Sequence, residues 1–224
     1  MTFSIAAICD RTGQIGYAVT TSSVCVGARV GRIGPDCVVF SQARTDPRLH
    51  EIGIAAHAAR PGAEAAVHAM RQAATGLHWR QLGVLSRSGD GAHYTGDSCL
   101  GFQGGMAERG CLALGNFLGS AGVLPAMIAA TSPGAPPLAE RLIAGLRAGQ
   151  AAGGENDPLQ SAALKILGSD GLYDVDLRID KSADPIEDLD SLWRDWQPKA
   201  AAYRVRAVSP DAAPPSSQVE HHGP

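Results

Sequence analysis

The second residue of the chain, Thr2, carries both groups that an acyl-transfer catalyst needs. Methionine is usually removed when a small residue follows it, and Thr2 would then be the first residue. Its hydroxyl would serve as the nucleophile, and its own α-amine would be the base that takes the proton. A free α-amine has a pKa of about 7.7–8.0, which suits a general base near neutral pH. The other interpretation is that Thr2 merely follows the start methionine.

The residues after Thr2 predict a hairpin that would bring more hydroxyl groups to it. Residues 3–8 are mostly apolar on both faces, as expected for a strand buried on both sides. A tight turn then leads to a return strand over residues 14–21. Antiparallel pairing places the end of the second strand beside the start of the first, so Thr20 and Thr21 would lie near Thr2. Alternatively, both are ordinary strand residues.

Three further residues could stabilise negative charge beside a nucleophile. Arg29 and Arg32 follow the hairpin, and a guanidinium could stabilise an alkoxide but could not shuttle protons. Solvated arginines at a strand edge are the alternative. Asn116 follows a glycine, and its amide could donate a hydrogen bond to an oxyanion. It could equally cap a helix that begins near Ser120, or occupy a turn.

Three polar residues are candidates for holding a polar substrate: Gln42, Asp157 and Gln160. Gln42 lies at the end of the fourth predicted strand, where a backbone N–H could also face the oxyanion. Asp157 and Gln160 lie in a Gly-rich loop and at the start of the strand that follows it. The alternative is that the Asp and Asn of this loop cap it.

Composition predicts one globular domain and excludes several classes of function. Of the 224 residues, 45% are hydrophobic and 18% charged, which is enough apolar surface for a substantial core. The net charge is −3 without clustered Lys or Arg, which argues against nucleic-acid partners and against anionic membranes. The five cysteines have no paired spacing and the histidines no ligand spacing, so we expect no disulfides, no metal and no cofactor. No signal peptide or membrane span is expected, and the predicted location is cytoplasmic.

The order of elements predicts an α+β fold. Strands over residues 3–43 precede helices over 49–75, and strands over 80–116 precede helices over 120–152. Two strands over 160–180 and a helix from Asp184 complete the domain, which we expect to span residues 2–198. Residues 199–224 read as a C-terminal extension that loses its regular structure beyond about residue 208, because it is rich in Pro and Ser.

Short motifs along the chain resemble a bacterial family, domain of unknown function 1028. They occur in the same order from residue 2 to about 190. Examples are Thr2-Phe3-Ser4-Ile5, Gly16-Tyr17-Ala18-Val19, Arg80-Gln81-Leu82-Gly83-Val84, Gly115-Asn116-Phe117-Leu118 and Gln160-Ser161-Ala162-Ala163-Leu164.

The resemblance implies the fold of the superfamily of N-terminal-nucleophile (Ntn) hydrolases, which includes proteasome β-subunits. That fold is a four-layer αββα sandwich of two stacked, mainly antiparallel sheets between helices. The resemblance also implies hydrolysis of an amide or carbamoyl-like C–N bond in a small molecule, and by analogy a homo-oligomer. Two alternatives remain open on the same fold: a hydrolase that uses a different internal residue, and a non-catalytic protein for ligand binding or assembly.

Overall fold

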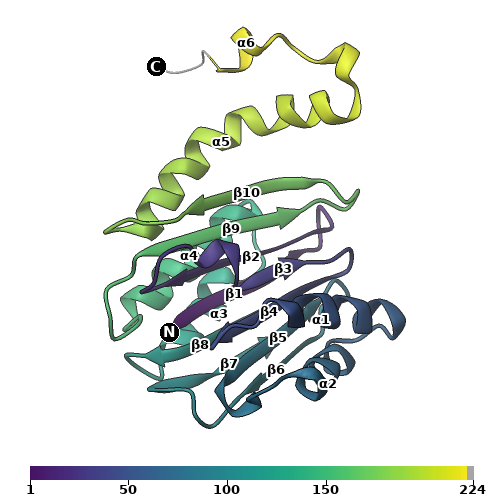
Figure 1. The fold of residues 1–224 in the computed structure, drawn as a ribbon. Coiled ribbons are helices and arrows are strands. Elements are labelled where there is room, and N and C mark those ends of the chain that lie inside the picture. Colours follow the sequence, from purple (N-terminus) through teal and green to yellow (C-terminus); the bar gives the residue numbers. More distant parts are fainter. Residues whose placement is uncertain (221–224) are drawn as a thin grey trace.

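Two antiparallel sheets stack face to face in the computed structural model, which describes residues 1–220 (Figure 1). The six strands of the larger sheet, in spatial order, are β10 (Tyr173–Ile179), β9 (Ser161–Leu167), β2 (Gln14–Thr21), β1 (Thr2–Cys9), β8 (Cys111–Leu118) and β7 (Phe102–Glu108). The four strands of the smaller sheet are β3 (Gly31–Ile33), β4 (Cys37–Ala43), β5 (Arg80–Ser86) and β6 (Gly91–Thr95). The first strand, β1, therefore lies in the interior of the larger sheet.

Helices cover the outer faces of both sheets. The smaller sheet packs against α1 (Arg48–Ala59) and α2 (Ala63–Ala73). The larger sheet packs against α3 (Val123–Thr131), α4 (Leu138–Ala151) and the first half of α5 (Pro185–Val208). These layers confirm the predicted four-layer αββα sandwich.

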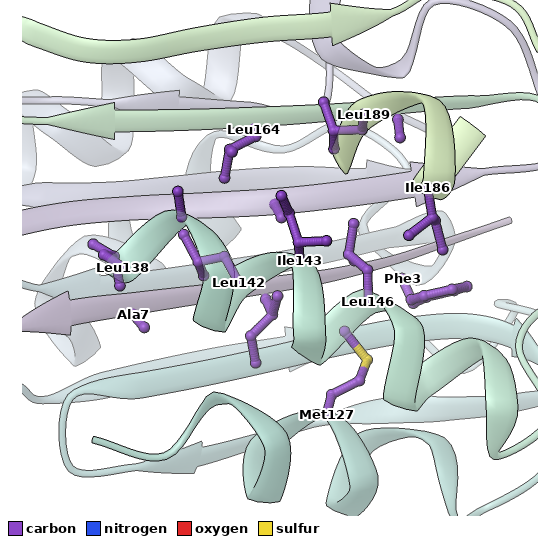
Figure 2. Close-up of a cluster of buried hydrophobic side chains, with 14 of the residues drawn as sticks. Phe3, Ala7, Met127, Leu138, Leu142, Ile143, Leu146, Leu164, Ile186 and Leu189 are labelled. Carbon is purple, nitrogen blue, oxygen red and sulfur yellow. The ribbon is translucent and has the colours of Figure 1, made fainter. Parts of the chain in front are cut away.

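The two faces of β1 serve different layers. Phe3, Ile5 and Ala7 point outward into the core under the helices, where they meet residues of α4 such as Leu142 and Leu146 (Figure 2). The alternate side chains point inward to the second sheet, and there Ala6 is part of the core between the sheets. Both faces are buried, as the apolar pattern predicted. Thr2 and Ser4 belong to the inward-facing set.

One strand was missed in the sequence. The pattern predicted a single strand over residues 106–116, but the chain forms two, β7 and β8, that reverse at Gly110. Gly110 has φ +78°, a conformation that glycine adopts without strain. The outer strand β7 contains two consecutive glycines and is largely exposed, so it lacks the regular apolar alternation by which a strand is recognised.

The C-terminal extension differs from the prediction. The domain boundary expected at residue 198 falls inside α5, which runs on to Val208 and is followed by the short helix α6 (Ser216–Glu220). Pro198 removes one backbone donor without ending the helix. Residues 221–224 of this extension lie outside the described part of the chain.

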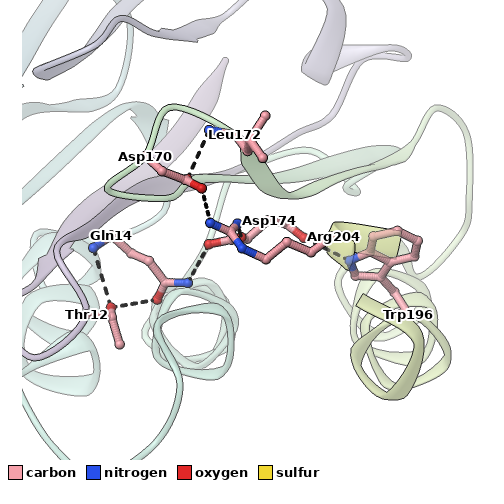
Figure 3. A network of polar contacts seen from close by, with 7 residues as sticks. All are labelled: Thr12, Gln14, Asp170, Leu172, Asp174, Trp196 and Arg204. Carbon is pink, nitrogen blue, oxygen red and sulfur yellow. Dashed lines mark hydrogen bonds and ion pairs between the residues drawn. The ribbon is translucent and has the colours of Figure 1, made fainter. Parts of the chain in front are cut away.

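Side chains on α5 hold its second half against the domain. The Trp196 indole donates to the Asp174 carbonyl at 2.9 Å, and Arg204 bridges the carboxylates of Asp170 and Asp174 (Figure 3). Gln14 joins the same network through a 2.8 Å bond to Asp174. These contacts explain why the helix persists beyond the predicted boundary.

Candidate active site

Thr2 lies at the first position of β1, on the face that points toward the second sheet. Its side chain is 4% exposed. Two neighbouring strands place polar residues beside it: Asn116 on β8 is its direct register partner, and Thr21 ends β2. The hydroxyl oxygens of Thr2 and Thr21 are 3.4 Å apart. The hairpin geometry therefore brings Thr21 to Thr2, as the sequence predicted.

Met1 covers this group of side chains. Its carbonyl oxygen accepts hydrogen bonds from the hydroxyls of both Thr2 and Thr21. The free α-amine belongs here to Met1, and the Thr2 nitrogen is part of a peptide bond. Burial lowers the pKa of the Met1 amine, whereas the negative charge of Glu155 opposes that change. The Met1 amine is thus shifted toward its basic, unprotonated form.

Glu155 is a neighbour of the site that the sequence analysis missed. One carboxylate oxygen, Oε2, accepts the backbone N–H of Ser22 at 3.1 Å. The other, Oε1, is buried and has no hydrogen-bond partner among residues 1–220. Burial raises the pKa of this carboxyl group. An acidic residue directly after Gly153-Gly154 was the available signal, although Asp157 in the same loop was the residue predicted to bind substrate.

Behind Thr2, buried amides from both sheets form a continuous chain of hydrogen bonds. Ser4 on β1 donates to Gln42 on β4 at 2.9 Å, and Gln42 donates to the Gln81 carbonyl on β5 at 2.7 Å. The Asn116 amide donates to the same Gln81 oxygen at 2.9 Å. Asn116 is thereby held in a fixed orientation at the edge of the Thr2 site.

Gln81 is the centre of this network and was also missed as a functional candidate. It is fully buried, and its Nε2 reaches the Thr95 hydroxyl and the carbonyls of Gly104 and Gly115 at 2.8–3.0 Å. A signal was present, because Gln81 occupies an inward position of β5 at which an apolar residue is expected. Gln42, predicted to bind substrate, is instead fully buried and engaged within this network.

A cavity of about 140 Å³ opens next to the Thr2–Asn116 pair. It is lined by Met1, Ala43, Arg44, Trp79, Ser98, Cys99, Leu100, Asn116 and Phe117. The Arg44 guanidinium stacks on the Trp79 ring, 3.6 Å from its centroid. The space suits a small molecule that carries polar groups.

The backbone around this cavity is strained. Ala43 and Phe117 both have left-handed conformations, with φ of +66° and +60°. Phe117 is held in place from both sides: its N–H donates to the Leu100 carbonyl at 2.7 Å, and its own carbonyl accepts from Asn156. Non-glycine residues in this conformation cost about 1–3 kcal/mol each and tend to cluster at ligand sites. Two such residues line this one cavity, which makes it a candidate ligand site.

Several predicted residues are not brought to the Thr2 hydroxyl. Thr20 lies opposite Phe3, on the outward face, and donates to the Ser161 carbonyl at 2.9 Å. Arg32 forms an exposed ion pair with Glu51. Arg29 is half-buried and bonds to the Val24 carbonyl at 2.6 Å.

The two loop candidates have different positions. Gln160 donates to the Ser22 carbonyl at 2.6 Å, which ties the chain before β9 to the loop that follows β2. Asp157 is exposed, and its charge acts on the Met1 amine more weakly than that of Glu155.

Two classes of site are absent from residues 1–220. No group of three or more His, Cys, Asp or Glu side chains is arranged to hold a metal ion in this part of the chain. Among the same residues, no helix has the length and apolar character needed to cross a membrane.

Comparison with known proteins places the chain among structural relatives. Protein SPO2555 from Silicibacter pomeroyi, whose crystal structure is assigned to the family model DUF1028, aligns with a TM-score of 0.80 and 33% identity over 86% of this chain and 88% of that one. HslV from Trypanosoma brucei aligns with a TM-score of 0.47 and 14% identity, over 74% of this chain and 99% of that one. No curated protein matches. The model of the family of unknown function DUF1028 matches residues 2–189, and the chain belongs to that family.

Proposed function

We propose that this protein is an N-terminal-nucleophile hydrolase that cleaves a C–N bond of a small amide or carbamoyl-like compound. The observation that carries the proposal is the pairing of Thr2 with Asn116, which lines a small cavity together with Met1. Loss of Met1 would open this cavity toward Thr2, so that a nucleophile and a candidate oxyanion donor face the same space, as acyl transfer requires.

Removal of Met1 is the first step in this mechanism. It frees the Thr2 amine and vacates the position of the Met1 carbonyl, to which the Thr2 and Thr21 hydroxyls now donate. A substrate carbonyl in that position would lie beside the Thr2 hydroxyl. The Thr21 hydroxyl, 3.4 Å from that of Thr2, would help to orient the nucleophile.

The chemistry then follows in two halves. The Thr2 hydroxyl oxygen attacks the carbonyl carbon while the α-amine takes the hydroxyl proton. The second N–H of the Asn116 amide, whose first is bound to Gln81, stabilises the oxyanion. The resulting α-ammonium then gives its proton to the leaving nitrogen as the C–N bond breaks, and the amine product departs. Water, deprotonated by the α-amine, hydrolyses the ester left on Thr2 and releases the acid product.

A thiol mechanism at the same cavity is less favourable. Cys99 lines the cavity and would be the internal alternative to Thr2. Burial raises the pKa of its thiol, so little of the reactive thiolate forms near neutral pH.

The cavity also supports a proposal on substrate class. Arg44 is exposed, stacks on Trp79 and forms no ion pair within the described residues, so its guanidinium is available to a ligand. A planar guanidinium fits a carboxylate through two parallel hydrogen bonds. We therefore expect amides and ureido compounds with a carboxylate to be better substrates than their uncharged analogues.

The proposal is tested by mass and by covalent labelling. Intact mass should show loss of Met1, and a small β-lactone should acylate the Thr2 hydroxyl, adding the mass of one lactone to the N-terminal peptide. Thr21→Ala is the matched control, because it removes a neighbouring hydroxyl and leaves the nucleophile. Labelling that persists unchanged in Thr2→Ala, or a retained Met1 in the native protein, would refute the mechanism.

A further inference from the structure

A second cavity lies at the opposite end of β1 from Thr2. It has a volume of about 360 Å³ and is lined at its inner end by Ile8 and Cys9, which lie roughly 20 Å along the strand from Thr2. Four of the residues that line it are arginines: Arg11, Arg87, Arg109 and Arg141. It takes no part in the chemistry proposed for Thr2.

The wall of this cavity is built from hairpin turns of both sheets that are bonded to one another. The Gly110 N–H donates to the Gly89 carbonyl at 2.8 Å, and the Ile8 N–H donates to the Gly110 carbonyl at 3.0 Å. Arg87 donates to the carbonyls of Gly13 and Pro35, which joins the β1–β2 and β3–β4 turns to the group. The arginines are therefore presented from a connected framework rather than from separate loops.

Arg141 is the buried group at this site. Its side chain, which is on α4, lines the cavity although the residue is only 6% exposed. Its Nε and Nη2 donate to the carbonyls of Thr131 and Ser132 at 2.9–3.2 Å, at the end of α3. Among residues 1–220 it has no carboxylate partner, and its Nη1, which forms no hydrogen bond, is accessible to solvent.

The charge of Arg141 cannot be removed by deprotonation, because an arginine stays protonated in proteins. Carbonyls at a helix C-terminus compensate such a charge only in part. A buried charge is normally paired with an opposite one. The structure thus leaves room for an anionic partner on the cavity side of the guanidinium.

The rest of the cavity has an excess of positive charge. Arg11 and Arg109 are exposed and have no ion pair within the described residues. Arg87 has a long contact of 3.6 Å with Asp36. Of the described residues that line the cavity, Asp10 is the one carboxylate. If Arg87 is counted as neutralised by Asp36, three arginines and one aspartate remain in the lining. Their excess of positive charge favours a ligand with two or more negative charges.

We propose that this cavity binds a small molecule with a polyvalent oxyanion group, either a phosphate or a set of carboxylates. Guanidinium groups bind both chemistries through paired, charge-assisted hydrogen bonds. The volume exceeds that of a single phosphate group and falls at the lower end of the range for organic ligands, which is about 300–1,000 Å³.

Calorimetric titration of the full chain tests the site, with pyrophosphate and citrate as probes at low ionic strength. Saturable binding of either probe is expected, and the tighter of the two identifies the source as a phosphate or a polycarboxylate. Arg109→Gln should weaken this binding by about tenfold, as expected for loss of a hydrogen-bonded charge. Thr2→Ala should bind both probes as the native protein does.

Arg60→Gln is the matched control, because Arg60 is exposed and does not line the cavity. It changes the net charge by the same amount, so it distinguishes loss of a contact in the cavity from a general change in the electrostatic field of the protein. The proposal is overturned if neither probe gives saturable heat, or if Arg60→Gln weakens binding as much as Arg109→Gln does.

Discussion

Thr2 and Asn116 face each other as direct partners on two neighbouring antiparallel strands, β1 and β8. Directly opposite residues in such a pair point to the same face of the sheet, so both side chains are on the inner side of the sandwich. They are 4% and 2% exposed. The relationship is set by backbone register rather than by flexible side chains. It fixes the Thr2 hydroxyl beside an amide that lines the cavity.

Substitutions at Thr2 should separate the roles of its oxygen and its backbone. Thr2→Ala removes the attacking oxygen and should abolish both turnover and β-lactone labelling. Thr2→Ser keeps the oxygen and a small second residue, so it should retain measurable activity. Rates are measured on a panel of small amides and ureido acids, with circular dichroism to confirm the fold. Full activity in Thr2→Ala would exclude Thr2 as the nucleophile.

Asn116→Ala should reduce kcat far more than it weakens binding. Loss of one oxyanion donor typically costs about 10²–10³ in kcat, because the donor interacts most strongly with charge that forms in the transition state. Thr20→Val is a suitable comparison, since Thr20 is buried nearby but faces the helical layer. Steady-state kinetics on both variants distinguish a site effect from a packing effect. An unchanged kcat in Asn116→Ala would assign the oxyanion to backbone donors alone.

The sequence predicted much of the frame of this site because its signals are local. Buried strands and helices show as apolar periodicity, and the hairpin that begins at Thr2 shows as two strands and a turn. The pairing of Thr2 with Asn116 lies beyond such signals, because these residues are 114 positions apart in the chain and meet only through sheet order. Asn116 was selected for its type, and topology brought it to Thr2.

The errors have a physical origin as well. Thr20 and Thr21 are indistinguishable by composition, and the strand register alone decides that Thr21 faces Thr2 whereas Thr20 faces outward. Gln42 reads as a free polar side chain, but its partner Gln81 comes from another strand. In both cases the position of the residue in the sheets decides its role, and residue type alone does not reveal that position.

Gln81→Leu should destabilise the protein and also impair the site. The variant leaves the amides of Gln42 and Asn116 without their shared acceptor, and each buried unsatisfied donor costs about 1–3 kcal/mol. Gln160→Leu is the control, because Gln160 is exposed and forms a bond at the surface. Denaturant unfolding should show the free energy of unfolding falling by about 2 kcal/mol or more in Gln81→Leu, and by less in the control. Equal losses of unfolding free energy in the two variants would mean that the buried amide network stabilises the fold no more than a surface hydrogen bond does.

Truncation after Val208 should lower the melting temperature modestly. It removes α6, whose Val219 is buried and whose Glu220 bonds to Tyr203. Burial of a valine contributes about 1.5–3 kcal/mol when it is complete, and 1 kcal/mol corresponds to about 2–4 °C in a domain of this size. Val219→Ser in the full chain should reproduce most of the effect. Calorimetric scans that show no change in either protein would indicate that α6 does not dock in solution.

Truncation after Pro198 should be more damaging than truncation after Val208. The shorter chain also loses Arg204, whose guanidinium joins Asp170 and Asp174 (Figure 3). It further loses Tyr203, whose ring stacks on that of Trp196 with 5.2 Å between the centroids. Arg204→Gln in the full chain isolates the ion-pair part of this loss. The same calorimetric scans rank the three proteins. A Pro198 truncation as stable as the Val208 truncation would restore the domain boundary predicted from the sequence.

Glu155→Gln should stabilise the protein at neutral pH. Burial raises the pKa of this carboxyl group in the folded state, so the folded protein binds its proton more tightly than the unfolded chain does. Its contribution is therefore most favourable at low pH and is lost as the pH rises through the raised pKa. Glutamine resembles the protonated form, so the gain in melting temperature should be clear near pH 7 and should shrink near pH 4. Asp157→Asn, at an exposed position, should show little change at either pH.

The same variant should move the pH dependence of the reaction in a defined direction. A carboxylate near an amine favours the charged ammonium form, and Glu155 raises the pKa of the Met1 amine. We expect the same direction for the Thr2 amine that removal of Met1 exposes. Glu155→Gln removes that charge, so the amine pKa should fall and the basic form should persist at lower pH. The acid limb of the rate of β-lactone acylation should therefore shift to lower pH, measured from about pH 5 to about pH 9. Asp157→Asn should shift it less, because Asp157 is exposed and its charge is screened. A shift to higher pH in Glu155→Gln would show that the titrating base is not an amine beside Glu155.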